Sequence, residues 1–481
     1  MIDPLWLMLI GMVVVLGGIL VLRLHAFLAL ILGAIIVGSL TSGAALRQYA
    51  LDKNMTTAAT ETLVRQSTGE RIAIAFGQTC TKIGILIAMA SIIGKCLLES
   101  GAAERIIRSA LKRFGESRAP LAFLSSGFLL AIPVYFDTVF YLMIPLAKAM
   151  GMRTRRNYGL YVMAIVAGGT MAHSLVPPTP GPLFVAGELS VSLGLMILGG
   201  IIIGLFTASS GYAYALWANR RWPIVLRDSA DISAAELEAL SNKDERELPP
   251  LWLSVLPILL PIVLIAGQTI AGSFFKGPSS GESSKALGEL LALLDYLGNP
   301  NIALALAAAI ALATLTFRQN TDRKKIAAFV QSALSSAGVI ILITSAGGAF
   351  GGILQQTGIG PRIQELASTH QLAVLPLAFV VTAVVRTAQG SATVAMITAI
   401  GIMGGFANAG QLGFHPVYLA LVIGCGSKPI AWMNDSGFWL ICKMTGMTEA
   451  ETLKLSSAMM VVMALVGLVV IMIFARLLPL V

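Results

Sequence analysis

The stretch "AHSLVPPTPGP", residues 172–182, places four prolines within six positions, from Pro177 to Pro182. Proline lacks a backbone N–H and its ring clashes with the preceding helical turn, so no helix can run through this stretch. In a membrane, backbone carbonyls and amides released from a helix need other partners, either in the protein or in a water-filled cavity. If the chain spans a membrane, the stretch predicts a broken crossing.

The composition indicates that the chain does span a membrane. Hydrophobic residues make up 56% of it and charged residues 12%, about half the roughly 25% charged content that is usual in soluble domains. Apolar runs long enough to cross a hydrocarbon core of about 30 Å recur along the chain, at 4–22, 26–43, 191–217, 252–272, 300–317 and 457–480. We expect about ten crossings. The first run lacks a preceding basic segment, so we interpret it as mature structure rather than a cleaved signal.

The charges of the loops predict which side of the membrane each loop faces. Basic residues gather in four short connections, at 101–118, 148–156, 220–227 and 318–325. The positive-inside rule places all four in the cytoplasm, and it accounts for the net charge of +9 without a nucleic-acid partner. The acidic segment 228–249 is then a cytoplasmic linker, and 273–299, rich in Gly, Ser and Pro, is an external loop.

The first two basic connections lie too close together for two complete crossings. Residues 119–147 separate them, whereas two crossings need roughly 40 residues. The segment contains "IPVYFDTVF" (132–140), in which Pro133 breaks a helix and the polar Asp137 and Thr138 follow. Non-helical backbone at membrane depth must line a cavity or be buried in protein. We therefore expect a re-entrant hairpin over 119–150 with its tip inside the protein.

Several unusual segments recur at one offset. The pattern G-x-x-L-x-x-x-G-x-x-x-R-I starts at Gly94 and again at Gly351, 257 residues later. The same offset carries the hairpin segment 132–140 onto "QGSATVAMI" (389–397). It also carries "SLVPPTPGPLF" (174–184) onto "AWMNDSGFWLI" (431–441). Three features at one offset predict an internal repeat.

The charge of the equivalent loops indicates how the copies are related. The basic connection 101–118 corresponds to 358–375, where Arg362 is the single Lys or Arg. One loop is thus inside and its equivalent outside, which is an inverted-topology repeat. The alternative, a helical bundle with ordinary proline kinks, leaves this change of charge unexplained.

The sequence therefore predicts an all-α polytopic membrane protein, built as an inverted-topology repeat with two re-entrant hairpins and two broken transmembrane helices. The first repeat covers 1–227, with about five transmembrane helices plus the hairpin 119–150, and the linker 228–249 follows. The second repeat covers 250–481, with about five transmembrane helices plus the hairpin 372–407.

Polar side chains mark the predicted tips and breaks. The neutral ones are Thr138, Gln389, Ser391, Thr393, Asn434 and Ser436. Such a set suits a polyhydroxylated small molecule, and half-helix N-termini that point inward suit its carboxylate. Arg386 either neutralises that carboxylate or extends to the outer surface at the base of the hairpin. The same two interpretations apply to Lys428.

Two carboxyl groups stand in apolar segments. Asp435 and Asp137 would each cost roughly 2.5 to 3.5 kcal/mol at mid-helix if unpaired, and such residues usually mark a transport pathway. A carboxyl group without a partner can carry a proton, whereas a neighbouring cation gives it a structural role, such as capping an unwound segment. His173 relays protons, binds the solute or is a packing residue. We expect proton coupling by Asp435, Asp137 and His173, with Asp435 as the main carrier.

Six motifs occur in order over nearly the whole chain: "SGAAERI" (100–106), "RFGESRAPLA" (113–122), "IPVYFD" (132–137), "LVPPTPGP" (175–182), "AQGSATVA" (388–395) and "NDSGFW" (434–439). They resemble the signature segments of the gluconate permease (gluconate:proton symporter, GntP) family. The resemblance implies a secondary transporter of the bacterial inner membrane, which imports gluconate or a related sugar acid with protons. It needs no cofactor beyond the proton gradient. In some members the solute is a small polar amino acid.

The resemblance further implies kinship with the ion transporter superfamily, whose members place two hairpins and two broken helices in inverted repeats. They are usually homodimers and work by alternating access. Two histidines common in the family are replaced here. Thr179 stands between the prolines of the first break, and Ala431, Trp432 and Met433 stand where Ser-His-Val usually precedes the second.

Two other functions are open to a chain of this kind. A sodium-coupled carrier of a small carboxylate or amino acid would use unwound carbonyls and Ser, Thr or Asn oxygens as ligands. A membrane enzyme would need a motif such as H-E-x-x-H, and the four histidines have no such spacing. The four cysteines also lack metal-ligand spacing. We expect neither enzymatic activity nor a metal site.

Overall fold

The computed structural model describes residues 2–224, 226–227, 248–275, 285–319, 323–359, 374–407, 412–433 and 435–480. Every regular element in these ranges is a helix, and none is a strand. The predicted all-α class is confirmed. Asn434 and most of the predicted linker 228–249 lie outside the described residues.

The helices of the first half follow one another with short connections. They are α1 (Pro4–Leu20), α2 (Ala26–Leu40), α3 (Gly43–Asp52), α4 (Thr57–Arg65), α5 (Thr68–Glu99), α6 (Ala102–Phe114), α7 (Ala119–Leu130), α8 (Phe136–Thr154), α9 (Tyr158–Leu175), α10 (Pro180–Glu188) and α11 (Leu193–Arg221). Residues 131–135 separate α7 from α8, and 176–179 separate α9 from α10. Pro133, Pro177 and Pro178 thus lie between helices, and Pro180 begins α10.

The second half is also a series of helices. They are α13 (Leu251–Phe275), α14 (Lys285–Leu297), α15 (Pro300–Gln319), α16 (Arg323–Gln355), α18 (Val374–Gln389), α19 (Ala392–Ala407), α20 (Val417–Gly426), α21 (Ser436–Thr445), α22 (Glu449–Thr452) and, after a π-helical turn, α23 (Ala458–Leu477). Gly390 and Ser391 separate α18 from α19, and 427–435 separate α20 from α21.

Six segments are long and apolar enough to cross a membrane in the part of the chain that the structure describes. They are α5, α9 with α10, α11, the first part of α13, most of α16, and α22 through α23. Two bent pairs bring the number to eight: α2 with α3, bent by 101°, and α14 with α15, bent by 66°. The helices α1, α18, α19 and α20 are apolar but shorter. The chain is a multi-pass membrane protein.

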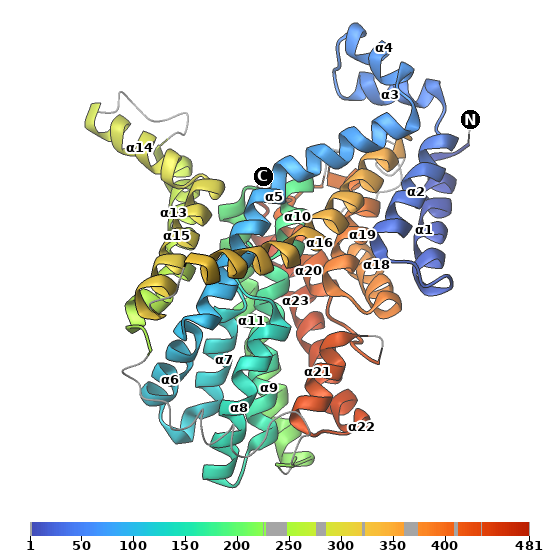
Figure 1. Cartoon of the computed structure of the whole chain (residues 1–481). Coiled ribbons are helices and arrows are strands. Elements are labelled where there is room, and N and C mark those ends of the chain that lie inside the picture. Colours follow the sequence, from blue (N-terminus) through green and yellow to red (C-terminus); the bar gives the residue numbers. More distant parts are fainter. Residues whose placement is uncertain are drawn as a thin grey trace.

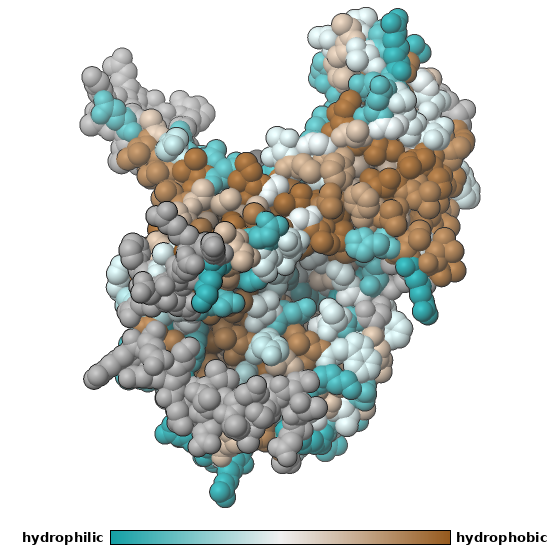
Figure 2. Space-filling model, in the orientation of Figure 1, coloured by the Kyte–Doolittle hydropathy of each residue, from teal (hydrophilic) through white to brown (hydrophobic). Residues whose placement is uncertain are grey.

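The surface agrees with this assignment. Large apolar side chains are exposed on several of the long helices, among them Leu28 on α2, Val263 on α13 and Val469 on α23. Figure 2 shows hydrophobic residues gathered over the middle and upper right of the visible face, with hydrophilic residues above and below. An exposed apolar surface of this extent is expected where lipid chains replace water.

Helix boundaries in the two halves match at the offset of 257 residues. The long helix α5 corresponds to α16, and the bent pair α2–α3 corresponds to α14–α15. Gly101 and Gly358, which are 257 residues apart, follow the two long helices with φ of 77° and 81°. Only glycine adopts this left-handed conformation without strain. These matches support the predicted repeat, and its inverted orientation remains our prediction.

The helices that surround the site pack in equivalent pairs. The hairpin helix α7 packs on α9, and α18 packs on α20. The second helix of each hairpin packs on the half-helix that follows the other half's break: α8 contacts α21, and α19 contacts α10. Figure 1 shows α6 to α9 at one end of the molecule, α1 to α4 at the other, and α16 crossing between α5 and the second hairpin. The two hairpin turns and the two breaks therefore meet in the interior.

Candidate functional site

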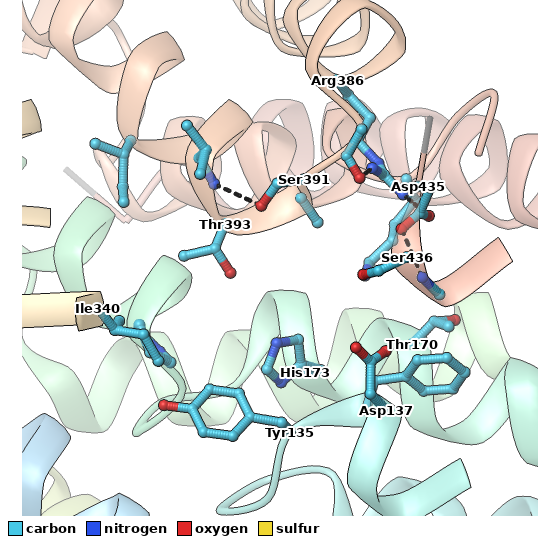
Figure 3. A pocket seen from close by; sticks show the side chains of 18 of the residues that line it. Tyr135, Asp137, Thr170, His173, Ile340, Arg386, Ser391, Thr393, Asp435 and Ser436 are labelled. Atoms are coloured by element: carbon cyan, nitrogen blue, oxygen red, sulfur yellow. Dashed lines mark hydrogen bonds and ion pairs between the residues drawn. The ribbon is translucent and has the colours of Figure 1, made fainter. Parts of the chain in front are cut away.

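One cavity of about 290 Å³ lies where the hairpin turns meet the helix breaks. This volume is near the lower end of the roughly 300 to 1,000 Å³ typical of ligand pockets, which suits a small solute. Its polar lining comes from Tyr135, Asp137, Thr170, His173, Thr344, Arg386, Ser391, Thr393, Lys428, Asp435 and Ser436. Figure 3 shows side chains of the second hairpin and second break above the cavity, and Tyr135, Asp137 and His173 below it.

Most of the predicted site residues line this cavity. They are Asp137, His173, Arg386, Ser391, Thr393, Asp435 and Ser436. Thr138 does not, because it follows Asp137 on α8 and successive helical residues point in different directions. It lines a second cavity, of about 230 Å³, beside α5 and α16. The side-chain amide of Gln389 is buried away from the first cavity, without a hydrogen-bond partner in the described chain.

The second hairpin turns on a glycine. Gly390 has a φ of 80°, and Ser391 then begins the next helix by accepting a hydrogen bond from the Val394 amide at 3.4 Å. The start of α19 faces the cavity, and Thr393 extends from it toward His173 (Figure 3). The first turn of a helix carries free amides and partial positive charge, which favour an anion.

Arg386 joins the second hairpin to the second break. Its guanidinium forms an ion pair with Asp435 and donates a hydrogen bond to the Gly390 carbonyl. Only 4% of Arg386 is exposed. The alternative in which this side chain extends to the outer surface is therefore wrong, since its partners lie at the hairpin turn inside the protein.

Asp435 begins the helix that follows the second break. Besides pairing with Arg386, its carboxylate accepts a hydrogen bond from the Gly437 amide at 2.9 Å, as the N-cap of α21. These contacts are the ones expected if Asp435 ties down the unwound segment. Trp432 and Trp439 also hold this segment, donating through their indole nitrogens to the carbonyls of Thr387 and Met433 at 2.8 and 2.7 Å.

The first break is held by the residue that replaces a family histidine. The hydroxyl of Thr179 lies 2.8 Å from the carbonyl oxygens of both His173 and Val176, and donates to them. It satisfies carbonyls at the end of α9 that have no helical partner, because the prolines that follow lack N–H groups. Ser427 donates to Ser174 at 3.3 Å, so the two breaks contact each other.

Asp137 enters the cavity from the opposite side. Its side chain is accessible there, and it makes no ion pair with a described residue. A β-carbon added to Gly437 would lie 3.5 Å from Oδ1 of Asp137 and 3.4 Å from Oδ1 of Asp435. The two carboxyl groups thus approach the same point at the N-terminus of α21.

His173 lies on the floor of the cavity, between Tyr135 and Asp137 in Figure 3. Its ring packs edge-on against the Tyr135 ring, with 5.9 Å between the centroids. The Nδ1 atom is buried and has no hydrogen-bond partner among the residues described. The sequence left packing, proton relay and solute binding as alternative roles of His173. The structure shows the packing contact with Tyr135 and, in addition, a ring nitrogen without a described partner.

The cavity also contains residues that sequence reasoning did not assign to it. Tyr135, Thr170 and Thr344 are polar positions in otherwise apolar helical segments, a signal too common to single them out. Lys428 lines the cavity and is 5% exposed, although the sequence left its direction open. A lysine directly after an apolar helix and before the second break was the available signal.

Comparison with known proteins agrees with the fold and the motifs. Two solved transporters share the fold: YdaH of Alcanivorax borkumensis (TM-score 0.60, 13% identity, 87% of this chain and 91% of that one) and MtrF of Neisseria gonorrhoeae (TM-score 0.62, 14% identity, 86% and 84%). At these identities the likeness shows a shared fold.

Relatives by sequence are permeases. The gluconate permease of Pseudomonas aeruginosa is 31% identical over 475 residues, 98% of each chain. The low-affinity gluconate transporter of Escherichia coli K12 is 34% identical over 463 residues, 95% of this chain and 94% of that one. An uncharacterized permease of Haemophilus influenzae is 32% identical over 433 residues, 89% and 83%. The GntP family permease pattern matches residues 3–477. The chain belongs to the GntP family of permeases.

Proposed function

We propose that this permease is a secondary active transporter of the bacterial inner membrane, which imports gluconate or a related sugar acid together with a proton. The observation that carries the proposal is the cavity itself, where two cations, two carboxyl groups and several hydroxyls meet at the hairpin turns and helix breaks. The two relatives named for gluconate, aligned over nearly the whole chain, support the choice of solute.

The lining matches the chemistry of a sugar acid. Hydroxyls of Thr170, Ser391, Thr393 and Ser436 offer donors and acceptors to a polyol chain. The starts of α19 and α21 add amides and partial positive charge for the carboxylate. Gln389 and Thr138 lie outside this cavity and have no part in the proposed binding; Asn434 lies outside the described residues.

Proton coupling follows from the charge that the solute brings. A monoanion that enters a cavity of low dielectric adds a negative charge, and a proton on one of the groups Asp435, Asp137 and His173 offsets it. The two equivalent halves then provide alternating access by movement of the hairpin-containing region against the remaining helices. The homodimer implied by the family resemblance is part of the same proposal.

Transport by purified protein in proteoliposomes tests this function. A pH gradient, acid outside, is expected to drive accumulation of radiolabelled gluconate, and a protonophore is expected to abolish it. A sodium gradient at equal pH is the control, because it should have no effect. Accumulation that follows sodium and ignores pH would instead support the sodium-coupled carrier. Failure of gluconate to exchange in counterflow would contradict the proposed solute.

A further inference from the structure

Lys428 presents a cation to the cavity without a directly bonded partner among the described residues. It follows α20 at the start of the second break, and its backbone amide is held by the Cys425 carbonyl at 3.1 Å. The ammonium group makes no hydrogen bond or ion pair with any residue that the structure describes. A buried ammonium without a counter-ion in direct contact is unfavourable, so this position favours the binding of an anion.

Of the charged groups near Lys428, Arg386 and Asp435 pair with each other, and Asp137 has no ion-pair partner among the described residues. The groups that act electrostatically on Lys428 are Arg386, Asp435, Asp137, Cys425 and His173. Arg386 and Asp435 neutralise each other through their ion pair. Asp137, on α8 across the cavity, is the remaining carboxylate, and it stands beyond ion-pair distance of both cations. Lys428 and Asp137 are therefore opposite charges that balance each other across an open space.

We propose that Lys428 receives the carboxylate of the transported acid, and that Asp137 takes up the coupled proton when the solute occupies Lys428. This inference rests on the proposed function. The empty cavity is neutral, with Lys428 balanced by Asp137 and Arg386 by Asp435. The bound solute adds one negative charge, and one proton from water, bonded to a carboxylate oxygen of Asp137, restores neutrality. Release of the solute returns that proton to water.

This assignment makes coupling a consequence of competition between two anions for one cation. When the solute carboxylate binds Lys428, the Asp137 carboxylate faces Asp435 without a counter-charge, because both approach Gly437. Like charges this close disfavour ionisation of both groups. A proton therefore binds with the solute and leaves with it. Asp435, which we expected from the sequence to be the main carrier, instead holds the hairpin and the break together.

Gluconate binding to the purified protein in nanodiscs tests the role of Lys428. Lys428→Met is expected to weaken binding about 30-fold or more, since it removes one partner of a buried charged pair. Lys428→Arg should retain part of the affinity. Lys443→Met is the matched control, because Lys443 is exposed and lies over the Trp439 ring. Binding by Lys428→Met within about threefold of wild type would overturn the assignment.

The pH dependence of the same binding tests Asp137. Uptake of one proton with the solute makes the affinity fall about tenfold per pH unit as pH rises, over the range where Asp137 is ionised in the empty cavity and protonated in the loaded one. Asp137→Asn should abolish this slope. Glu61→Gln, at an exposed carboxylate that does not line the cavity, is the control and should leave the slope unchanged. A slope that persists in Asp137→Asn, or that is also lost in Glu61→Gln, would contradict the proposal.

A double variant keeps the test valid if a single variant folds poorly. Lys428→Met with Asp137→Asn removes both charges together, so its melting temperature is expected to be higher than that of Lys428→Met alone. A double variant less stable than both single variants would show that the two charges do not balance each other. Gluconate that fails to bind the wild type at any pH would count against the proposed function, whereas gluconate that still binds Lys428→Met counts against Lys428 alone.

Discussion

Arg386 connects the second hairpin to the second break. It contacts the second break through Asp435 and the hairpin turn through the Gly390 carbonyl. The side chain of Arg386 is 5% exposed and that of Asp435 is 13% exposed, so each charge would be poorly solvated if the other were removed. The interaction therefore stabilises one arrangement of hairpin and break.

Removal of one charge of this pair is the first prediction. Arg386→Met is expected to lower the free energy of unfolding by about 3 to 5 kcal/mol, because it leaves a buried carboxylate without its partner. Combining it with Asp435→Asn should recover part of the loss, since Asn still caps a helix. Chemical unfolding in detergent measures both.

An exposed pair supplies the control for this prediction. Arg47 and Glu61 lie 3.5 Å apart with about half of each side chain exposed, and such pairs contribute roughly 0 to 1 kcal/mol. Arg47→Met should thus leave stability nearly unchanged. Equal effects of Arg386→Met and Arg47→Met would show that the buried pair does not hold the site.

Thr179 carries the second prediction. Thr179→Val keeps the shape of the side chain but removes the hydroxyl that donates to the carbonyls of His173 and Val176. Leaving these buried acceptors unsatisfied should lower the free energy of unfolding by about 1 to 3 kcal/mol. Thr179→Ser retains the hydroxyl and should behave like the wild type. Equal losses in both variants would contradict a hydrogen-bonding role.

Residue types in the sequence identified most of the site residues, but they did not show which way each side chain points. Asp137 and Thr138 are neighbours in an apolar segment, yet only Asp137 lines the first cavity, because the register of α8 is set by packing that no pattern reveals. Arg386 and Lys428 had two interpretations each for the same reason. Long side chains reach several ångströms from their backbone, so their endpoints depend on partners distant in sequence.

At the scale of helices, close packing of the hairpins depends on glycine. Gly168 on α9 lies against α7 so closely that an added β-carbon would stand 2.1 Å from the Leu124 carbonyl oxygen and 2.9 Å from the Phe128 amide nitrogen. Both obstructing atoms belong to backbone, which cannot rotate away. Small residues allow such close approach between helices in membranes.

Gly168→Ala is therefore the third prediction. The methyl group must push α7 away from α9, with a loss of at least about 2 kcal/mol in the free energy of unfolding. Gly187→Ala on α10 is the matched control, because an added β-carbon there meets nothing within 4 Å. Thermal unfolding of the two variants compares them directly. A wild-type melting temperature for Gly168→Ala would refute the packing described here.

Helix ends were more predictable than helix bends. Pro133, Pro177 and Pro178 lie between helices, and Pro180 and Pro182 lie in the first turn of α10, where proline is tolerated. In contrast, the apolar run 26–43 suggested a single crossing, whereas α2 ends at Leu40 and α3 leaves it at 101° after Ser42 caps the new helix. Hydropathy reports the apolar length of a segment, but the angle at a cap depends on the helices packed around it.

For the whole molecule, loop contacts and helix lengths bear on the orientation of the two halves. Arg227, in a basic connection that we place in the cytoplasm, pairs with Glu451 at 2.7 Å and donates to the Gly446 carbonyl at 3.2 Å. The loop between α21 and α22 therefore lies beside that connection. The equivalent loop, between α10 and α11, is separated from it by the 29 residues of α11, about 44 Å of helix.

Opposite exposure of these equivalent loops is the last prediction. In a background without the four native cysteines, Ser190→Cys and Thr448→Cys each place one exposed thiol at the two positions. A membrane-impermeant maleimide should label Ser190→Cys in intact cells and Thr448→Cys only after permeabilisation, because α11 is long enough to cross the bilayer between them. Retained gluconate uptake in both variants would show that each is folded. Labelling of both thiols from one side would exclude an inverted repeat, since equivalent loops would then share a face of the membrane.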